Sequence, residues 1–154
     1  MNHTILLKEP FQVCGLSVKL SGSQNENSKL IQNLWQLFNR ELRSKNIILG
    51  KNWKKYGVTY QSKDCYFYIA AIPFNISYKG FSIIEISGGK FASFQHVGAM
   101  NLLKSTYYNI YKKLLPKSSL LVDKNRYVLH YEVYDNRFNW NKADSTIDII
   151  IPIK

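Results

Sequence analysis

The stretch that decides the fold class lies at positions 127 to 134 and has the sequence Tyr127-Val128-Leu129-His130-Tyr131-Glu132-Val133-Tyr134. Tyrosine and valine favour β-structure, and four polar residues precede the run, so we predict a β-strand. Successive side chains of a strand point to opposite faces. Glu132 is therefore expected to share a face with Val128, His130 and Tyr134, and both faces of the strand are mostly apolar or aromatic.

Glu132 is the one carboxylate in this run. Burying an unpaired carboxylate is very costly, so this side chain has to be paired with a cation, be protonated, or line a cavity that receives a cation. Two interpretations stay open. Either Glu132 forms a salt bridge with Arg126 or Arg137 that closes a strand end, or it is the counter-charge of a ligand.

The composition is that of one globular domain over residues 1–154, with 45% hydrophobic and 14% aromatic residues. The apolar runs are far too short to cross a bilayer core of roughly 30 Å. The N-terminal run Ile5-Leu6-Leu7 is shorter than the apolar core of a secretory signal. We therefore expect a cytoplasmic protein with no membrane partner.

The charge balance is strongly basic, with 21 Lys and Arg against 10 Asp and Glu and a net charge of +11. Such a charge favours acidic partners, either nucleic acid or an acidic protein surface. The lysines are spread along the whole chain, and no helix-turn-helix, zinc-finger or RNA-binding motif accompanies them. A solvated basic surface is the preferred interpretation, and no direct sequence-specific DNA binding is predicted.

The cysteines and histidines do not form a metal-binding pattern. Cys14 and Cys65 make no CxxC motif, and His3, His96 and His130 are scattered. Two isolated thiols in a cytoplasmic chain are expected to be reduced core residues. Neither a metal nor another cofactor is predicted.

The first half of the chain predicts strands around one helix. Positions 5–20 have β-type composition with a mild break at Pro10. From Ser28, a candidate N-cap, apolar residues recur at helical spacing as far as Leu42, so the helix should end near Lys45-Asn46. Strands over 56–61 and 65–74 are expected around a polar turn.

The second half has the same elements. Strands over 82–87 and 90–97 flank Gly88-Gly89, and a Gly-Gly pair between two strands predicts a two-residue hairpin. A helix is expected from Ala99 to Leu115, where Pro116 stops it. The closing strands are predicted over 127–134 and 145–153.

The two halves resemble each other, and we predict an internal duplication. Each half, about 1–78 and 80–154, is expected to form one βαββ unit, and the two units to form a pseudo-twofold α+β domain with an antiparallel sheet. A central ligand cleft is expected at the seam between the units. The matched segments are Phe11-Gln12-Val13-Cys14-Gly15 with Phe94-Gln95-His96-Val97-Gly98, Trp35 and Phe38 with Tyr108 and Tyr111, and Ile72-Pro73-Phe74 with Ile151-Pro152-Ile153.

Six groups of residues, in order along nearly the whole chain, also carry a resemblance to a known family. They are Leu34-Trp35-Gln36-Leu37-Phe38, Tyr68-Ile69-Ala70-Ala71-Ile72, Gly88-Gly89-Lys90-Phe91-Ala92-Ser93-Phe94 with His96 and Gly98, Leu114-Leu115-Pro116, Tyr131-Glu132-Val133-Tyr134 with Arg137-Phe138, and Asp148-Ile149-Ile150-Ile151-Pro152-Ile153. In these the chain resembles the GyrI-like small-molecule-binding domain, also called the AraC-type or bacterial transcription activator effector-binding domain.

The resemblance implies a duplicated βαββ fold with an aromatic-walled cavity that binds lipophilic cations. In the family, a glutamate of the second half faces the cavity, and the matching residues here are Glu132 and Tyr134. A carboxylate among aromatic rings attracts a desolvated cation, to which each ring face adds a cation–π attraction of about 0.5 to 2 kcal/mol. Tyr68 matches a family position for the opposite wall, although core packing explains it equally well.

The remaining candidate ligand contacts are weaker. Tyr56, Tyr60 and Trp53 are candidates for the cavity wall, and Trp35 is one because the family's first helix borders the cleft. Core packing is nevertheless the preferred interpretation of Trp35. His130 is expected on the same strand face as Glu132 and could act with it as an acid and base, but no nucleophile or metal accompanies the pair, so no catalytic residue is predicted.

Three functions follow from these residues. The preferred hypothesis is a stand-alone binding protein for amphipathic, cationic small molecules, because the two repeats occupy the chain and leave no room for the DNA-binding unit of family regulators. It would sequester the ligand or present it to a partner regulator. The resemblance implies the other two, because some family members resemble gyrase inhibitors and others resemble hydrolases of small electrophiles. The second is therefore a protein-interaction module, and the third is such a hydrolase. Anionic or neutral ligands also stay open, because the chain is so basic.

Overall fold

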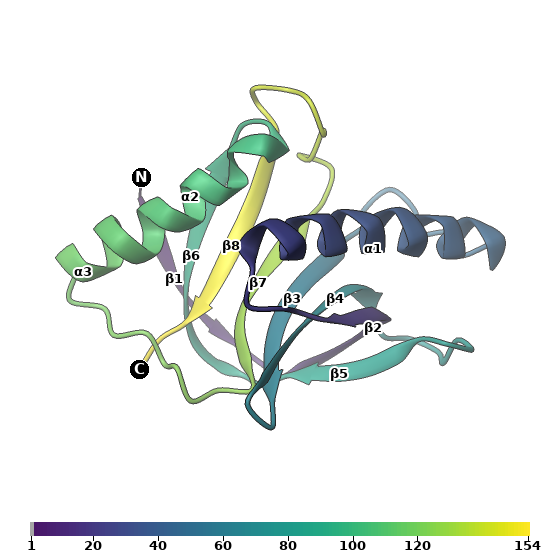
Figure 1. Cartoon of the computed structure of the whole chain (residues 1–154), viewed down its shortest axis with the longest axis horizontal. Helices are drawn as coiled ribbons and strands as arrows, with labels where there is room; N and C mark the ends of the chain where they lie inside the picture. The colour runs from purple at the N-terminus through teal and green to yellow at the C-terminus, as the bar shows by residue number, and fades with distance from the viewer. Residues whose placement is uncertain (1) are drawn as a thin grey trace.

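The computed structural model describes residues 2–154, which form one antiparallel sheet with helices on one of its faces (Figure 1). The sheet has eight strands. Their bounds are β1 His3–Lys8, β2 Phe11–Lys19, β3 Lys55–Ser62, β4 Cys65–Pro73, β5 Ser82–Ile86, β6 Gly89–Val97, β7 Val128–Tyr134 and β8 Thr146–Pro152.

The strand order reveals the duplication. The order across the sheet is β1-β6-β8-β7-β3-β4-β2-β5, and exchanging β1 to β4 with β5 to β8 gives the same order reversed. A pseudo-twofold axis therefore passes between β3 and β7. The α+β class, the antiparallel sheet and the duplication are confirmed. Each unit has an edge strand outside the predicted βαββ pattern, β1 beside β6 and β5 beside β2. The strand over 82–87 was predicted, whereas β1 was not separated from β2.

Each of these edge strands is exchanged, which means that it pairs with a strand of the other unit. Two connections differ from the sequence-based prediction for this reason. Positions 5–20 form two strands with different partners, so the break at Pro10 is complete. The Gly88-Gly89 hairpin prediction is wrong, since β5 and β6 lie far apart in the strand order. The two connections cross closely instead: a Cβ on Gly88 would lie 2.7 Å from the carbonyl oxygen of Lys8, a contact that only glycine avoids.

The ladder also fixes the register of the repeat. Val13 pairs with Pro73 and Phe91 pairs with Pro152, so Val13 corresponds to Phe91 when the two prolines are superposed. The prediction that matched Phe11 with Phe94 is therefore out of register, because Gly89 is the counterpart of Phe11. Repetition of a residue type cannot by itself align two strands, since an odd shift places every side chain on the other face.

Helix α1 spans Gln24–Ser44 and begins earlier than predicted. Its N-cap is Ser23, whose side chain accepts a hydrogen bond from the backbone N–H of Glu26, so Ser28 lies inside the helix. The C-terminal end is close to the predicted Lys45-Asn46. Leu34, Phe38 and Leu42 are buried on the face that covers β2 and β4.

The second helical region is one continuous run made of four stretches with different hydrogen-bond patterns. They are η1 Met100–Leu102, α2 Leu103–Asn109, the π-helical η2 Ile110–Leu114 and α3 Leu115–Lys117. The prediction that Pro116 ends the helix at Leu115 is wrong by one short turn. Pro116 is tolerated because it stands in the first turn of a new segment, where its missing N–H has no partner to lose.

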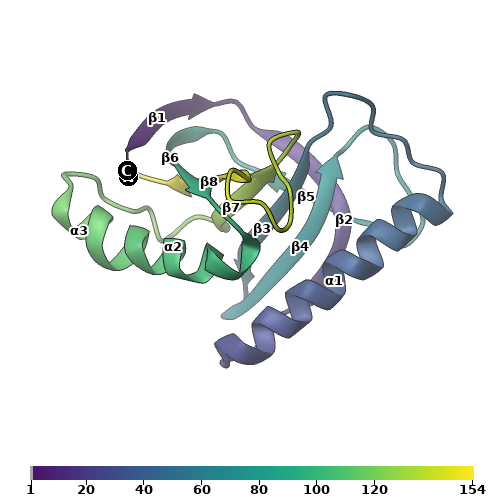
Figure 2. The same ribbon diagram turned by 90° about the horizontal axis from the view of Figure 1, so that it is seen from above.

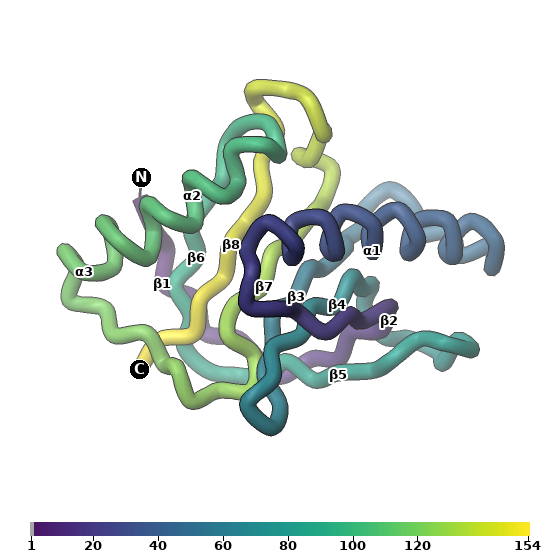
Figure 3. The backbone as a smooth tube through the Cα atoms, in the orientation of Figure 1, coloured from purple at the N-terminus to yellow at the C-terminus, as the bar shows by residue number. Residues whose placement is uncertain are grey.

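The sheet is curled so that each face has its own core. On the concave face, Phe11 of β2 contacts Tyr131 of β7 across two intervening strands, with ring centroids 5.9 Å apart. The convex face carries two clusters, one under α1 and one under α2–α3. Figure 2 shows the two helical regions on either side, with β3 and β7 between them, and the chain path is followed most easily in Figure 3.

One face assignment in β7 changes because of a bulge. The pairing shifts between Thr59 and Tyr60 of β3, so that Thr59 pairs with His130 and Tyr60 with Val128. Val128 therefore packs in the concave core with Tyr131, not beside Glu132 as predicted. Among residues 2–154, no helix has the length and apolar character needed to span a membrane.

Candidate functional site

Glu132 lies on β7 beside the pseudo-twofold axis, on the convex face between the two helical regions. Its side chain is 5% exposed. The residue opposite on β3 is Gly57, so the equivalent strand of the other unit supplies no second side chain here. A single buried carboxylate thus marks the seam between the two units.

Three tyrosine hydroxyls donate hydrogen bonds to this carboxylate. Tyr68 of β4 donates to Oε1 at 3.0 Å, and Tyr134 donates to the same oxygen at 2.7 Å. Tyr107 of α2 donates to Oε2 at 2.6 Å. Donors from both units and from a helix therefore converge on Glu132, and hydrogen bonds to a charged acceptor are the strong ones.

Trp35 of α1 fixes the direction of one of these bonds. Its indole Nε1 donates to the hydroxyl oxygen of Tyr68 at 2.9 Å. Since indole N–H can only donate, the proton of Tyr68 is left to point at Glu132. A carboxylate accepts all three tyrosine bonds at once, whereas a protonated acid would need an acceptor of its own. The geometry therefore suits the ionised form.

Burial and hydrogen bonding act on the pKa of Glu132 in opposite directions. Burial raises the pKa above its ordinary value of 4.5, while the bonds from Tyr107, Tyr134 and Tyr68 lower it, and burial is the larger effect. Burial and the charge of Glu132 also raise the pKa of each tyrosine well above 10. The three hydroxyls thus stay protonated and remain donors at neutral pH.

The salt-bridge interpretation of Glu132 is wrong. Arg126 contacts Asp123 at 3.4 Å and lies over the ring of Phe91, and Arg137 contacts Asp135 and Asp148 at 2.9 and 2.6 Å. Among the described residues, no ion pair of 4.0 Å or shorter includes Glu132. The carboxylate is satisfied by dipoles and has no counter-cation from residues 2–154.

Gly57 provides the space that this arrangement needs. A Cβ at position 57 would collide with the hydroxyl of Tyr68 and lie 2.7 Å from Oε1 of Glu132. Its backbone is not in the left-handed region, so close approach rather than backbone conformation requires glycine here. Even an alanine would separate Tyr68 from Glu132.

Aromatic rings surround the carboxylate. Trp35 meets Tyr134 edge to face at 5.2 Å between centroids, and Tyr134 meets Phe138 in the same way at 5.1 Å. On the other side Tyr107 lies 5.0 Å from the ring of His130, whose Nδ1 is 3.0 Å from the hydroxyl of Tyr111. Ring faces and one anionic group are the elements of a site for an organic cation.

The structure brings four of the predicted contacts together, namely Glu132, Tyr134, Tyr68 and Trp35. Tyr56 and Tyr60 lie in the concave core, on the opposite face of the sheet. Their even positions on β3 place them there, since Gly57 faces Glu132. Trp53 lies before β3, where the Nζ of Lys55 is 5.6 Å from the centre of its ring.

Two residues of this site were missed among the predicted contacts. Tyr107 stands on the apolar face of its helix, where a tyrosine looks like core, while the repeat drew attention to Tyr108, which is 60% exposed. Gly57 has no side chain to attract notice. A glycine inside an aromatic strand is a usable signal, because it often marks close approach of another group. Within residues 2–154, no group of three or more metal-ligating residues occurs.

A family model matches this architecture over its full extent. The model describes the GyrI-like small molecule binding domain and matches residues 1–154. The chain belongs to the GyrI-like family. The expectation drawn from its motifs is thereby confirmed, and Glu132 with its tyrosines lies in a GyrI-like domain. No curated protein matches the chain.

Solved structures share the GyrI-like fold at low sequence identity. One is SAV2435 bound to tetraphenylphosphonium, with 14% identity, a TM-score of 0.80, and coverage of 100% of this chain and 94% of that one. A hydrolase from Listeria innocua has 13% identity, a TM-score of 0.56, and coverage of 99% and 91%. EcmrR in a complex with DNA has 14% identity, a TM-score of 0.60, and coverage of 99% and 57%.

Proposed function

We propose that this GyrI-like domain binds a lipophilic organic cation against Glu132. The observation that carries the proposal is a buried carboxylate held by three tyrosine hydroxyls with no counter-cation among the described residues. In such a site, the free-energy cost of burying the negative charge is part of folding, so the ligand does not add this cost when it binds. A cation that enters gains Coulomb attraction in a dry environment, and its own desolvation is cheap if its charge is spread over rings.

The aromatic side chains act as the walls and the entrance. Trp35 and Tyr107 belong to the two helical regions, and both are only partly buried. Ligand entry is expected to displace one of these rings from Glu132 and to replace hydrogen bonds by ring contacts. A structural neighbour, SAV2435, was solved with tetraphenylphosphonium, which is a cation of this class and therefore the first compound to test.

The test compares tetraphenylphosphonium with triphenylphosphine oxide, a neutral compound with similar rings. Tetraphenylphosphonium at a hundredfold excess over its dissociation constant should stabilise the wild type by about 2.7 kcal/mol, seen as a rise of several degrees in the unfolding midpoint. The rise should be lost in Glu132→Gln and kept in Glu85→Gln, an exposed glutamate on β5. Equal shifts in both variants, or no shift at all, would overturn the proposal.

We propose binding without turnover as the role of Glu132. A hydrolase would need a lone pair of the carboxylate directed at a water, whereas three tyrosine protons already take up three of its roughly four acceptor positions. One structural neighbour is nevertheless a hydrolase. Hydrolysis of a small electrophile that disappears in Glu132→Gln would support the enzymatic alternative and count against this role.

In the cell, we propose that the domain sequesters its ligand or presents it to a protein partner. The neighbour EcmrR carries a related fold within a DNA-bound regulator, which supports a link to transcription. The net charge of +11 supports an acidic partner surface. We also propose a cytoplasmic location, which the two free cysteines, Cys14 and Cys65, support. A salt-dependent pull-down that survives Glu132→Gln would favour the interaction role over ligand binding.

A further inference from the structure

A second concave site lies where α3 ends and the chain returns toward the sheet. It is a groove of about 570 Å³, within the range of small-molecule pockets. Its lining is mixed, and its apolar part includes Leu115, Pro116, Leu120 and Leu121. Leu121 is 65% exposed, so the groove presents apolar surface to solvent. None of these residues contacts Glu132 through a hydrogen bond.

The wall of this groove is held in place by the backbone. Val122 forms a bridge with Ile153, and the N–H of Asp123 donates to the carbonyl of Pro152 at 2.9 Å. The N–H of Lys154 donates to the carbonyl of Leu121 at 2.8 Å. Because the segment after α3 is tied to the chain beyond β8, the groove exists before any ligand binds.

The side chains at the rim are basic. Lys124 and Lys154 line the groove together with the amide of Asn125, and no carboxylate side chain lines it. Asp123, the adjacent acid, is already engaged by the guanidinium of Arg126 at 3.4 Å. The charge of the groove is therefore opposite to that of the Glu132 site.

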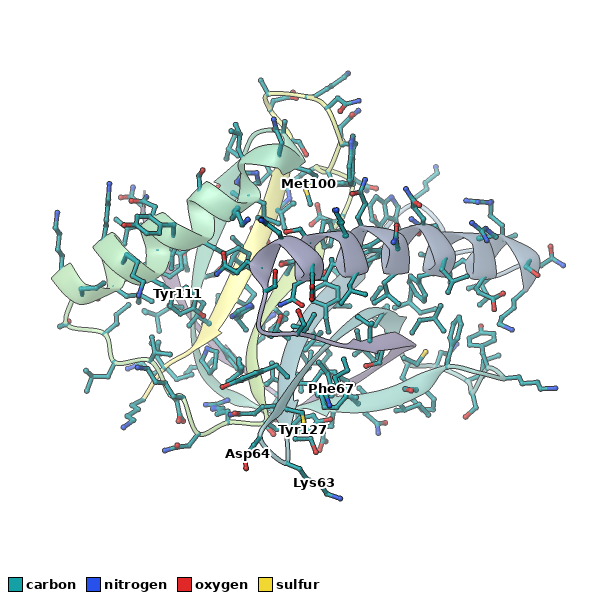
Figure 4. All side chains as sticks on the ribbon, in the orientation of Figure 1. Lys63, Asp64, Phe67, Met100, Tyr111 and Tyr127 are labelled. Atoms are coloured by element: carbon teal, nitrogen blue, oxygen red, sulfur yellow. The ribbon has the colours of Figure 1, made fainter. Side chains whose placement is uncertain are left out.

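Tyr111 also lines the groove. Its hydroxyl is 3.0 Å from Nδ1 of His130, and Figure 4 shows the residue on the sheet side of its helix. The ring adds an aromatic surface to the aliphatic walls. The lining thus combines apolar side chains with two lysines, which is the pattern that an amphipathic anion requires.

We propose that this groove binds a small amphipathic anion, with an apolar body along Leu115 and Leu120 and one carboxylate or sulfonate at Lys124. The groove is distinct from the cation site at Glu132 but adjacent to it, because Tyr111 stacks on Tyr107, the donor to Oε2 of Glu132, with ring centroids 6.5 Å apart. It also gives part of the strong positive charge a specific use, because lysines at an apolar groove select the sign of the ligand.

The test is calorimetric titration with octanoate, and with 1-octanol as the neutral control. Octanoate should bind the wild type with one-to-one stoichiometry, more tightly than octanol. Lys124→Glu should weaken octanoate binding by roughly fivefold, as expected for reversing a solvent-exposed charge. Asn125→Trp, which places an indole in the groove from an exposed position, should abolish it.

Lys79→Glu is the matched charge control, because it changes the net charge equally in the exposed loop before β5, across the molecule from α3 (Figure 1). It should keep octanoate affinity within about twofold. Absence of octanoate binding, equal binding of octanol, or equal weakening by both lysine variants would overturn the proposal. Glu132→Gln should bind octanoate like the wild type, so this result is read independently of the cation experiment.

Discussion

Gly57 and Glu132 face each other across β3 and β7, and the hydroxyl of Tyr68 occupies the space that a side chain at position 57 would fill. The two residues occupy equivalent positions on either side of the pseudo-twofold axis. The second unit therefore supplies the charged side chain of Glu132. The first unit supplies Gly57, whose missing side chain leaves space for the hydroxyl of Tyr68 to reach the carboxylate. Duplication with this one asymmetry yields a single carboxylate where a symmetric pair would repel.

The first prediction concerns this pair. Gly57→Ala should push Tyr68 away from Glu132, weaken tetraphenylphosphonium binding by about tenfold, and destabilise the protein by about 1 to 3 kcal/mol, as expected for overpacking. Urea unfolding and calorimetric titration measure the two effects. Gly22→Ala is the control, because a Cβ there would meet nothing within 4 Å. Equal effects of the two changes would show that space at Gly57 is unimportant.

Tyr107→Phe should remove one hydrogen bond from Oε2 of Glu132 while keeping the ring. The loss of a bond to a charged group should cost about 1.5 to 3 kcal/mol in the free energy of unfolding. The pKa of Glu132 should rise further, because that bond lowers it. Carbon-13 NMR of the carboxyl group measures the pKa directly. Tyr108→Phe, on the exposed side of the same helix, should change neither quantity.

The buried charge of Glu132 should make stability depend on pH. Its pKa in the folded state is above 4.5, so the folded protein holds this proton more tightly than the unfolded chain. The contribution of Glu132 to the free energy of unfolding therefore falls as the pH rises from about 4.5 through the folded pKa. Glu132→Gln does not titrate, so wild type should lose stability relative to this variant over that interval. A constant difference from pH 4 to pH 8 would contradict the argument.

The contribution of His130 to the free energy of unfolding should depend on pH in the opposite sense to that of Glu132. Burial lowers its pKa from 6.5 to about 4, so the unfolded chain takes up this proton first as the pH falls. Stability due to the neutral ring is complete above pH 6.5 and should be lost toward pH 4. The loss relative to His130→Gln should be on the order of 2 kcal/mol, measured by urea unfolding.

Much of the fold was accessible from the sequence because local patterns determine it. Alternating apolar residues predict β3, β4 and the closing strands, and apolar residues at helical spacing predict the buried face of α1. The exchanged edge strands did not follow. A Gly-Gly pair between two strands predicts a hairpin, whereas the curvature of the sheet carries β5 and β6 to different partners.

Some residues of the candidate site were also predicted from the sequence, and others were missed. Glu132 and Tyr134 were found because a carboxylate in an aromatic strand is conspicuous and matches a family motif. Tyr107 and Gly57 were missed, since a tyrosine on an apolar helix face looks like core and a glycine has no side chain. The bulge opposite Thr59 moved Val128 to the other face, which strict alternation cannot anticipate.

The sequence by itself determined the family, the α+β class and the duplication, because motifs and element patterns along the whole chain carry them. It also placed one carboxylate in an aromatic strand, which depends only on local residue types. Only the tertiary structure decided what surrounds that carboxylate. The tyrosine hydroxyls that donate to it come from β4, β7 and α2, and Gly57 of β3 leaves the space that this arrangement needs. Contacts between residues far apart in the chain depend on strand order and curvature, which emerge only when both units pack together.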